Sequence, residues 1–136
     1  MKRTRDRTAA KPASWIERID APVAVRGAST GFSVLVVGGL AQPLAAAWVP
    51  MFGAGWLPLV AVVAFVVASR RIGTATLPAL HGGVAALCAY LLALPLALLV
   101  PAGRDPGQIA LTAVTAVLTG GVVGFLRGRS RFHTRE

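Results

Sequence analysis

Uncharged, mostly apolar runs alternate with short charged segments along the chain. Three runs carry no formal charge at all: 43 residues at 27–69, 32 residues at 72–103 and 21 residues at 106–126. A bilayer core about 30 Å thick needs roughly 20 apolar residues in a helix. The first run therefore has room for two membrane spans and each of the others for one, which predicts four transmembrane helices.

Local signals set the limits of these spans. Their expected positions are about 27–48, 53–69, 78–100 and 106–126. Asp105 followed by Pro106 favours a helix start, because the carboxylate caps free N–H groups and proline has no N–H to leave unsatisfied. No run alternates apolar with polar residues as a barrel strand does. The predicted fold class is all-α, an integral membrane four-helix bundle.

Basic residues predict the orientation of the bundle. Of the 14 Lys and Arg, 13 fall in the N-terminal tail, at Arg70 and Arg71, or in the C-terminal tail, whereas Arg104 alone falls on the other side. The positive-inside rule then places both termini in the cytoplasm and the protein in the cell membrane. Trp48 and Trp56 flank the uncharged outer turn, where aromatic rings favour the membrane–water boundary.

Two basic cytoplasmic tails flank the spans in this organisation, at 1–26 and 127–136. A capping-box spacing, Ser-x-x-Glu, predicts a short amphipathic helix at about 14–20 that Pro22 ends. This helix is expected either to lie on the inner leaflet or to serve as an ordinary linker. The first 47 residues also have the layout of a secretory signal peptide, but the basic leader is long and the apolar run continues into the next span.

Composition narrows the partners. The chain is 55% hydrophobic and 14% charged, with a formal charge of +9, whereas a soluble domain is about 25% charged. No DNA-binding motif accompanies the basic tails, so no nucleic acid is expected. Anionic lipid of the inner leaflet is the expected partner. The candidate headgroup-binding residues are Lys2, Arg3, Arg5, Arg7, Lys11, Arg127, Arg129 and Arg131.

Polar residues within the spans are few. No Asp, Glu, Lys or Arg lies in any span, which argues against proton-coupled exporters, since these use a carboxylate in the membrane. The candidate intramembrane polar residues are Gln42, His81, Tyr90, Thr115 and Thr119. His81 is expected to bond a headgroup or a backbone carbonyl, or to act as a proton-sensitive group. Gln42 is expected to bond the carbonyl that Pro43 frees, or another helix.

No arrangement of these residues predicts catalysis. A nucleophile needs a base and an orienting group within reach, and His81 shares its span with no acid. Cys88 is the only cysteine, which excludes an intramolecular disulfide, and His81 is the only histidine within the spans, so no metal cluster is expected. The sequence therefore predicts that the protein is not an enzyme and has no cofactor and no metal.

Small residues are arranged in two stripes of four-residue spacing. Such spacing lets helix backbones approach closely in lipid, where packing drives association. The stripes are Ala85, Ala89, Ala93 and Ala97 in the third span, and Thr112, Ala116, Gly120 and Gly124 in the fourth. Both are candidate helix-packing surfaces, within the bundle or between copies.

Two stretches of the chain are alike: 40–45 (LAQPLA) and 92–97 (LALPLA). Each lies toward the outer end of the first helix of a hairpin. A duplicated hairpin would explain the likeness, and so would chance in a chain this rich in Ala and Leu. A real repeat would make Pro43 and Pro95 equivalent kinks.

A family resemblance rests on three segments: Ala-Ser-Arg-Arg-Ile-Gly at 68–73, Leu-His-Gly-Gly at 80–83 and Gly-Gly-Val-Val-Gly at 120–124. With the Gly-rich first span, they resemble small four-span membrane proteins of the YrzE type, over about 27–129. That family has no established activity to carry over. The resemblance implies a topology and no mechanism.

Three functions fit these observations. The first is a structural or accessory membrane protein that packs against copies of itself or in a larger complex. The second is a passive channel, holin-like pore or transporter, with Gln42, His81 and the Thr row of the fourth span along its path. The third is a lipid-binding regulator that uses the basic tails.

Overall fold

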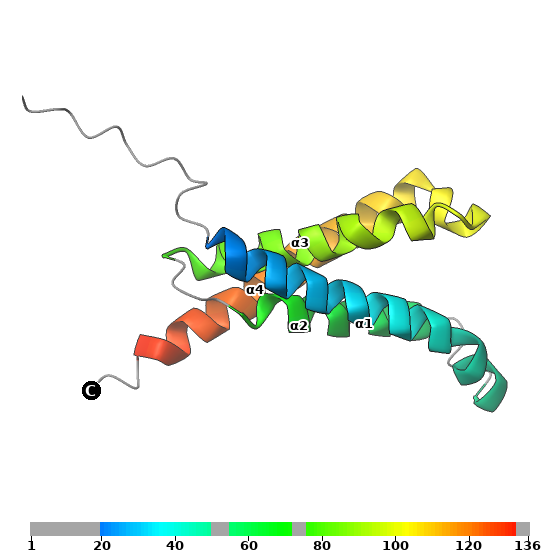
Figure 1. Cartoon of the computed structure of the whole chain (residues 1–136), viewed down its shortest axis with the longest axis horizontal. Coiled ribbons are helices and arrows are strands. Elements are labelled where there is room, and N and C mark those ends of the chain that lie inside the picture. The colour runs from blue at the N-terminus through cyan, green and yellow to red at the C-terminus, as the bar shows by residue number, and fades with distance from the viewer. Residues whose placement is uncertain (1–19, 50–54, 72–75, 133–136) are drawn as a thin grey trace, which may run out of the picture.

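Four α-helices and one 3-10 turn make up the part of the chain that the computed structural model describes, residues 20–49, 55–71 and 76–132. The elements are α1 (Ala21–Trp48), α2 (Trp56–Ser69), α3 (Pro78–Ala97), η3 (Pro101–Arg104) and α4 (Pro106–Phe132). The described residues include no strand, and the all-α prediction is confirmed (Figure 1). Residues 1–19, which include the basic N-terminal residues and most of the helix expected at 14–20, lie outside the described residues.

Three helices, α1, α3 and α4, are long and apolar enough to cross a membrane. The fourth, α2, is apolar but has 14 residues. At 1.5 Å per residue it extends about 21 Å, which is less than the roughly 30 Å of a hydrocarbon core. The four-span topology therefore stays a prediction, with α2 as its shortest element.

The start of α1 differs from the expected one. Asp20 precedes the helix, and its side chain accepts a hydrogen bond from the Val23 N–H at 3.3 Å. Pro22, expected to end an earlier helix, instead lies in the first turn of α1, where its missing N–H costs nothing. The helix therefore begins before Gly27 and includes Arg26.

The later helices also differ in length from the expected spans. α3 ends at Ala97, three residues before the expected limit, and the chain then turns into η3. α4 continues through Arg127 to Phe132, because exposed arginines are good helix formers and do not end a helix. The start of the C-terminal tail is thus helical.

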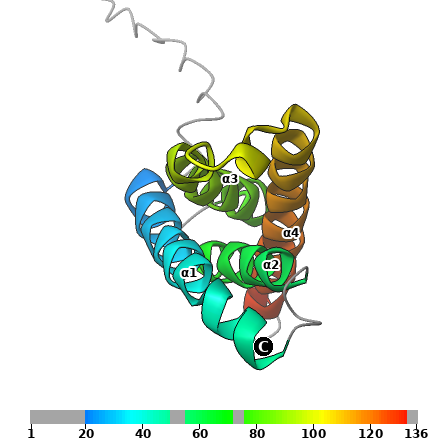
Figure 2. The ribbon, with the colours of Figure 1, turned by 90° about the vertical axis from the view of Figure 1, so that its right-hand side faces the viewer.

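The helices pair as two hairpins, α1–α2 and α3–α4, with α2 and α3 also in contact with each other. α1 contacts α2 and α3, and α4 contacts α2 and α3 (Figure 2). The hairpins meet at one end and diverge toward the other (Figure 1). We call the end where the hairpins meet the closed end (21–31, 60–71, 76–90 and 116–130). We call the end where they diverge the open end (32–49, 55–59 and 91–115).

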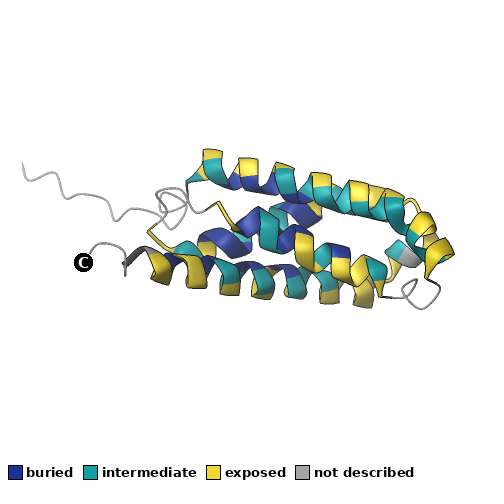
Figure 3. Cartoon of the chain, turned by 90° about the horizontal axis from the view of Figure 1, so that it is seen from below, coloured by how far each residue is buried: buried dark blue, intermediate teal, exposed yellow. Residues whose placement is uncertain are grey.

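The buried residues gather at the closed end (Figure 3). One cluster contains Phe65, Ala86, Tyr90 and Ala116, and a second contains Ala28, Ala68 and Ala89. Most of these side chains are small, so the core depends on close approach of backbones rather than on large apolar side chains.

The two similar stretches take comparable places in the hairpins. Pro43 lies inside α1 and Pro95 inside α3, each near the open-end limit of its helix. The second helices differ, because α2 has 14 residues and α4 has 27. The duplicated hairpin stays a prediction.

Candidate functional site

The contact between α3 and α4 is made of glycine and alanine. A Cβ added to Gly120 would lie 2.7 Å from the Cβ of Ala86 and would collide with the Gly82 carbonyl oxygen. A Cβ on Gly82 would lie 3.0 Å from the Gly124 Cα. No side chain fits between these backbones, which is the geometry that small residues at four-residue spacing allow.

A second contact of the same kind joins α1 to α2 and α3. A Cβ on Gly31 would lie 2.8 Å from the Ala68 Cβ and 3.0 Å from the Ala89 Cβ. A Cβ on Gly27 would collide with the Ala68 carbonyl oxygen and would lie 3.7 Å from the Ala85 Cβ. Gly27 and Gly31 are four residues apart, so α1 presents a G-x-x-x-G surface to both neighbours.

The two stripes expected from the sequence contact different helices. Ala85 and Ala89 are fully buried and lie against the glycines of α1, whereas Gly120 and Gly124 lie against the start of α3. Ala116 is fully buried, and Ala93, Ala97 and Thr112 are half-buried. The residues that sequence reasoning missed are Gly27, Gly31 and Gly82, although Gly27 and Gly31 have the same four-residue spacing as the predicted stripes.

Two buried polar side chains join α2 and its following segment to α3. The Ser69 Oγ lies 2.6 Å from the Phe65 carbonyl oxygen and 3.0 Å from the Gly82 carbonyl oxygen, and its hydroxyl donates to both. The His81 Nε2 lies 2.9 Å from the Arg71 carbonyl oxygen. Since a carbonyl only accepts, Nε2 carries the hydrogen. Both side chains are fully buried, and both hold the closed end together.

The other polar residues that are predicted to lie within the membrane are separated from His81. Tyr90 is buried, and its hydroxyl donates to the Ile109 carbonyl oxygen on α4 at 3.4 Å. Thr115 donates to the Leu111 carbonyl oxygen of its own helix at 2.8 Å. Gln42 and Thr119 are half-buried, on α1 and α4. None of the five lines the cavity between α1 and α2 or the smaller cavity between α3 and α4. The passive channel stays a prediction that a flux measurement in liposomes would test.

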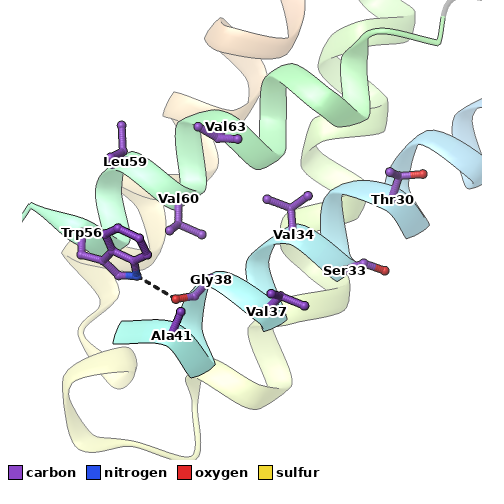
Figure 4. Close-up of a pocket in the computed structure, with 10 residues that line it drawn as sticks. All are labelled: Thr30, Ser33, Val34, Val37, Gly38, Ala41, Trp56, Leu59, Val60 and Val63. Carbon is purple, nitrogen blue, oxygen red and sulfur yellow. Dashed lines mark hydrogen bonds between the residues drawn. The ribbon is translucent and has the colours of Figure 1, made fainter. Parts of the chain in front are cut away.

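The larger of these cavities lies between α1 and α2 and has a volume of about 530 Å³. Figure 4 shows Thr30, Ser33 and Val37 of α1 along one side and Leu59 and Val63 of α2 along the other. Trp56 lies across one end, where its indole Nε1 donates to the Gly38 carbonyl oxygen at 2.8 Å (Figure 4). We call this cavity the α1–α2 groove.

Exposed arginines gather at the closed end. Arg26, Arg70, Arg71, Arg127 and Arg129 are all exposed there. The Arg129 guanidinium lies 5.6 Å from the centre of the Phe125 ring, a cation–π distance. Arg104 lies at the open end, where its Nε donates to the Leu98 carbonyl oxygen at 2.8 Å. Of the predicted headgroup-binding residues, Arg127 and Arg129 are described with their side chains.

Groups that bear redox or metal chemistry are sparse in the described part of the chain. Cys88 is half-buried and free. Among the described residues, no three His, Cys, Asp or Glu side chains lie close enough together to hold a metal ion.

No protein-family model matches this chain, and comparisons with curated proteins and with solved structures found no match. The YrzE-type resemblance therefore stays a prediction.

Proposed function

We propose that this chain is a multi-pass integral membrane protein with both termini in the cytoplasm, and that it acts as an accessory component by packing its helices against a second copy or a larger complex. The apolar character and length of α1, α3 and α4 support the membrane location. The division of basic residues, 13 against 1, supports the orientation.

The proposal that the chain packs against a partner rests on one face of α4. Large apolar side chains recur at intervals of three and four residues and are at least half exposed: Leu111, Val114, Leu118, Val122 and Phe125. We call this the outer α4 face. Its spacing is that of helices that pack at about +20° in membrane bundles. Since Gly120 and Gly124 are already used against α3, assembly with a partner helix would use the outer α4 face instead.

Extraction into polymer nanodiscs followed by mass measurement tests the assembly. We expect a discrete complex larger than one 14.0 kDa chain, and we expect Leu111→Ala with Leu118→Ala to reduce it. Leu40→Ala is the matched control, because Leu40 is 75% exposed on α1, away from this face. A single chain in every nanodisc would contradict the proposal.

Cysteine labelling tests the orientation separately. In a Cys88→Ser background, Ser130→Cys lies at the closed end and Gln108→Cys at the open end, and both positions are exposed. With a membrane-impermeant maleimide, we expect only Gln108→Cys to react in intact cells and only Ser130→Cys in inverted vesicles. Reaction of both from the same side would show that α4 does not cross the membrane.

A further inference from the structure

The α1–α2 groove offers a ligand apolar contacts and almost no free polar group. The Thr30 hydroxyl donates to the Arg26 carbonyl oxygen at 2.8 Å, and the Ser33 hydroxyl to the Ser29 carbonyl oxygen at 3.0 Å. The Trp56 N–H is bonded to Gly38 across the groove. The polar hydrogens of the lining are therefore satisfied within the protein, so an occupant of the groove has to be apolar.

Both walls of the groove continue toward an arginine. On α1, Arg26 precedes Thr30 by four residues and Ser33 by seven, so it shares their helix face. On α2, Arg70 follows Val63 by seven residues and continues that face. Both arginines are exposed, and within the described part of the chain neither is in an ion pair.

The packing of the hairpin brings these two arginines to the same end. Gly27, next to Arg26, lies against the Ala68 carbonyl, and Ala68 is two residues before Arg70. Two positive charges thus stand at the closed-end mouth of an apolar groove. Such an arrangement is complementary to an amphipathic anion with its charged group at one end.

The length of the groove matches one leaflet of a bilayer. Its α1 wall runs from Thr30 to Ala41, which is about 16 Å at 1.5 Å per residue. Half of a hydrocarbon core of about 30 Å is about 15 Å. A lipid with its headgroup beside the closed end therefore has acyl chains of the right depth to follow the groove toward Trp56. The bond from Trp56 to Gly38 puts this ring near the bilayer centre in such an arrangement, and not at the outer boundary expected from the sequence.

We propose that the α1–α2 groove binds one acyl chain of an anionic phospholipid whose phosphate is held by Arg26 and Arg70. The site uses none of the headgroup-binding residues predicted in the basic tails, and it is separate from the outer α4 face. It rests on the membrane location proposed above, and its occupant belongs to the leaflet that adjoins the closed end.

Fluorescence quenching of Trp56 tests this site in the full chain. Trp15→Phe and Trp48→Phe leave Trp56 as the only tryptophan. The protein is reconstituted in vesicles of fixed phosphatidylcholine and phosphatidylglycerol content, with bromine near the chain ends of either one lipid or the other. We expect brominated phosphatidylglycerol to quench with an apparent preference of about 30-fold per molecule, from two arginines near an anionic headgroup.

Matched variants locate the lipid. Arg26→Gln with Arg70→Gln should remove the preference, and Arg104→Gln should keep it, because Arg104 is at the open end. Val63→Phe should remove it by filling the groove, whereas Val62→Phe should not, because Val62 is exposed but does not line the groove. Circular dichroism checks that each variant keeps its helices.

Each remaining outcome would overturn a defined part of the proposal. Equal quenching by both brominated lipids would mean that only bulk lipid touches Trp56. A preference that survives Arg26→Gln with Arg70→Gln would assign the effect to other basic residues, and one that survives Val63→Phe would exclude the chain from the groove. Quenching by neither lipid would contradict the membrane location itself.

Discussion

The closed and open ends of the bundle are built from the same kinds of residue, but the closed end is tightly packed and the open end leaves large apolar side chains exposed. At the closed end, Ala64, Phe65 and Ala68 have no exposed surface, and glycines of α1 and α4 touch neighbouring backbones. At the open end, Leu40 and Leu44 are 75% and 66% exposed. In lipid, large apolar side chains gain little by leaving the acyl chains, so close packing of small residues decides where helices meet.

Side-chain hydrogen bonds also differ between the closed end and the open end. The buried Ser69 hydroxyl and the His81 ring bond to carbonyls outside their own helices. The open-end hydroxyls of Thr112 and Thr115 donate to carbonyls of their own helix, four residues earlier. Among the described residues, polar side chains therefore join one hairpin to the other only at the closed end. At the open end, side-chain hydrogen bonds between helices stay within a hairpin, such as the bond from Trp56 to the Gly38 carbonyl oxygen.

Leucine at a closed-end glycine is expected to have the largest effect. Gly82→Leu and Gly120→Leu would each place a side chain where the facing backbone already lies. Overpacking costs about 1–3 kcal/mol, and we expect the upper end of this range because the clash is with backbone atoms. The free energy of unfolding, measured by reversible SDS denaturation with circular dichroism, should fall by that amount and the α3–α4 hairpin should separate.

The control for this prediction is Gly39→Leu. Gly39 lies in the middle of α1 with nothing within 4 Å of an added Cβ. Its substitution should leave stability almost unchanged. A loss at Gly39 as large as that at Gly120 would show that contact with a facing backbone is not the cause of the loss, since leucine forms helix better than glycine.

The sequence predicts the closed end better than the open end. Four-residue spacing of small side chains identifies Gly120 and Gly124, because the spacing is a property of one helix. It does not identify their partners: Gly120 and Gly124 contact Gly82 and Pro78, not the predicted alanine stripe. Pairing depends on how helices rotate about their axes, and the all-round apolar spans give no polar face to fix that rotation.

The ends of the helices are a second feature that the sequence predicts only in part. The charges of Arg26 and Arg127 predict the edges of two spans, yet α1 begins before Arg26 and α4 continues past Arg127. Charge reports where the hydrocarbon ends and not where the helix ends. The sequence also does not predict the divergence of the hairpins or the α1–α2 groove, because both arise from contacts between helices.

Removal of His81 is expected to have the next largest effect. The ring is fully buried, and its Nε2 donates to the Arg71 carbonyl oxygen beyond the end of α2. His81→Ala should cost about 1–3 kcal/mol of unfolding free energy from the lost hydrogen bond alone. His81→Leu restores most of the volume and also removes Nδ1, which is buried without a hydrogen-bond partner, so the cost that remains in this variant is a lower limit on the contribution of the Nε2 bond. If His81→Leu had the same free energy of unfolding as the original chain, His81 would contribute to stability through packing alone.

Ser69→Ala is expected to cost less, about 0.6 kcal/mol, the average for hydrogen bonds between helices in a membrane. The substitution removes the bond from Ser69 to the Gly82 carbonyl oxygen on α3, together with the bond to Phe65 within α2. Ser33→Ala is the matched control, since the Ser33 hydroxyl bonds only within α1. Equal costs in the SDS titration would mean that the contact between α2 and α3 adds nothing to stability.

The smallest effect is expected from shortening a large side chain at the open end. Leu40→Ala should change the unfolding free energy by no more than about 0.5 kcal/mol, because Leu40 is 75% exposed. Phe65→Ala, at the closed end, should cost about 2 kcal/mol, because Phe65 is fully buried and its removal leaves a cavity between the helices, although the transfer term that applies in water is absent in lipid. The two variants belong in one titration in the same lipid–detergent mixture. A cost at Leu40 that approaches the cost at Phe65 would mean that the hairpins close over Leu40 in the membrane, and the two ends would then be packed alike.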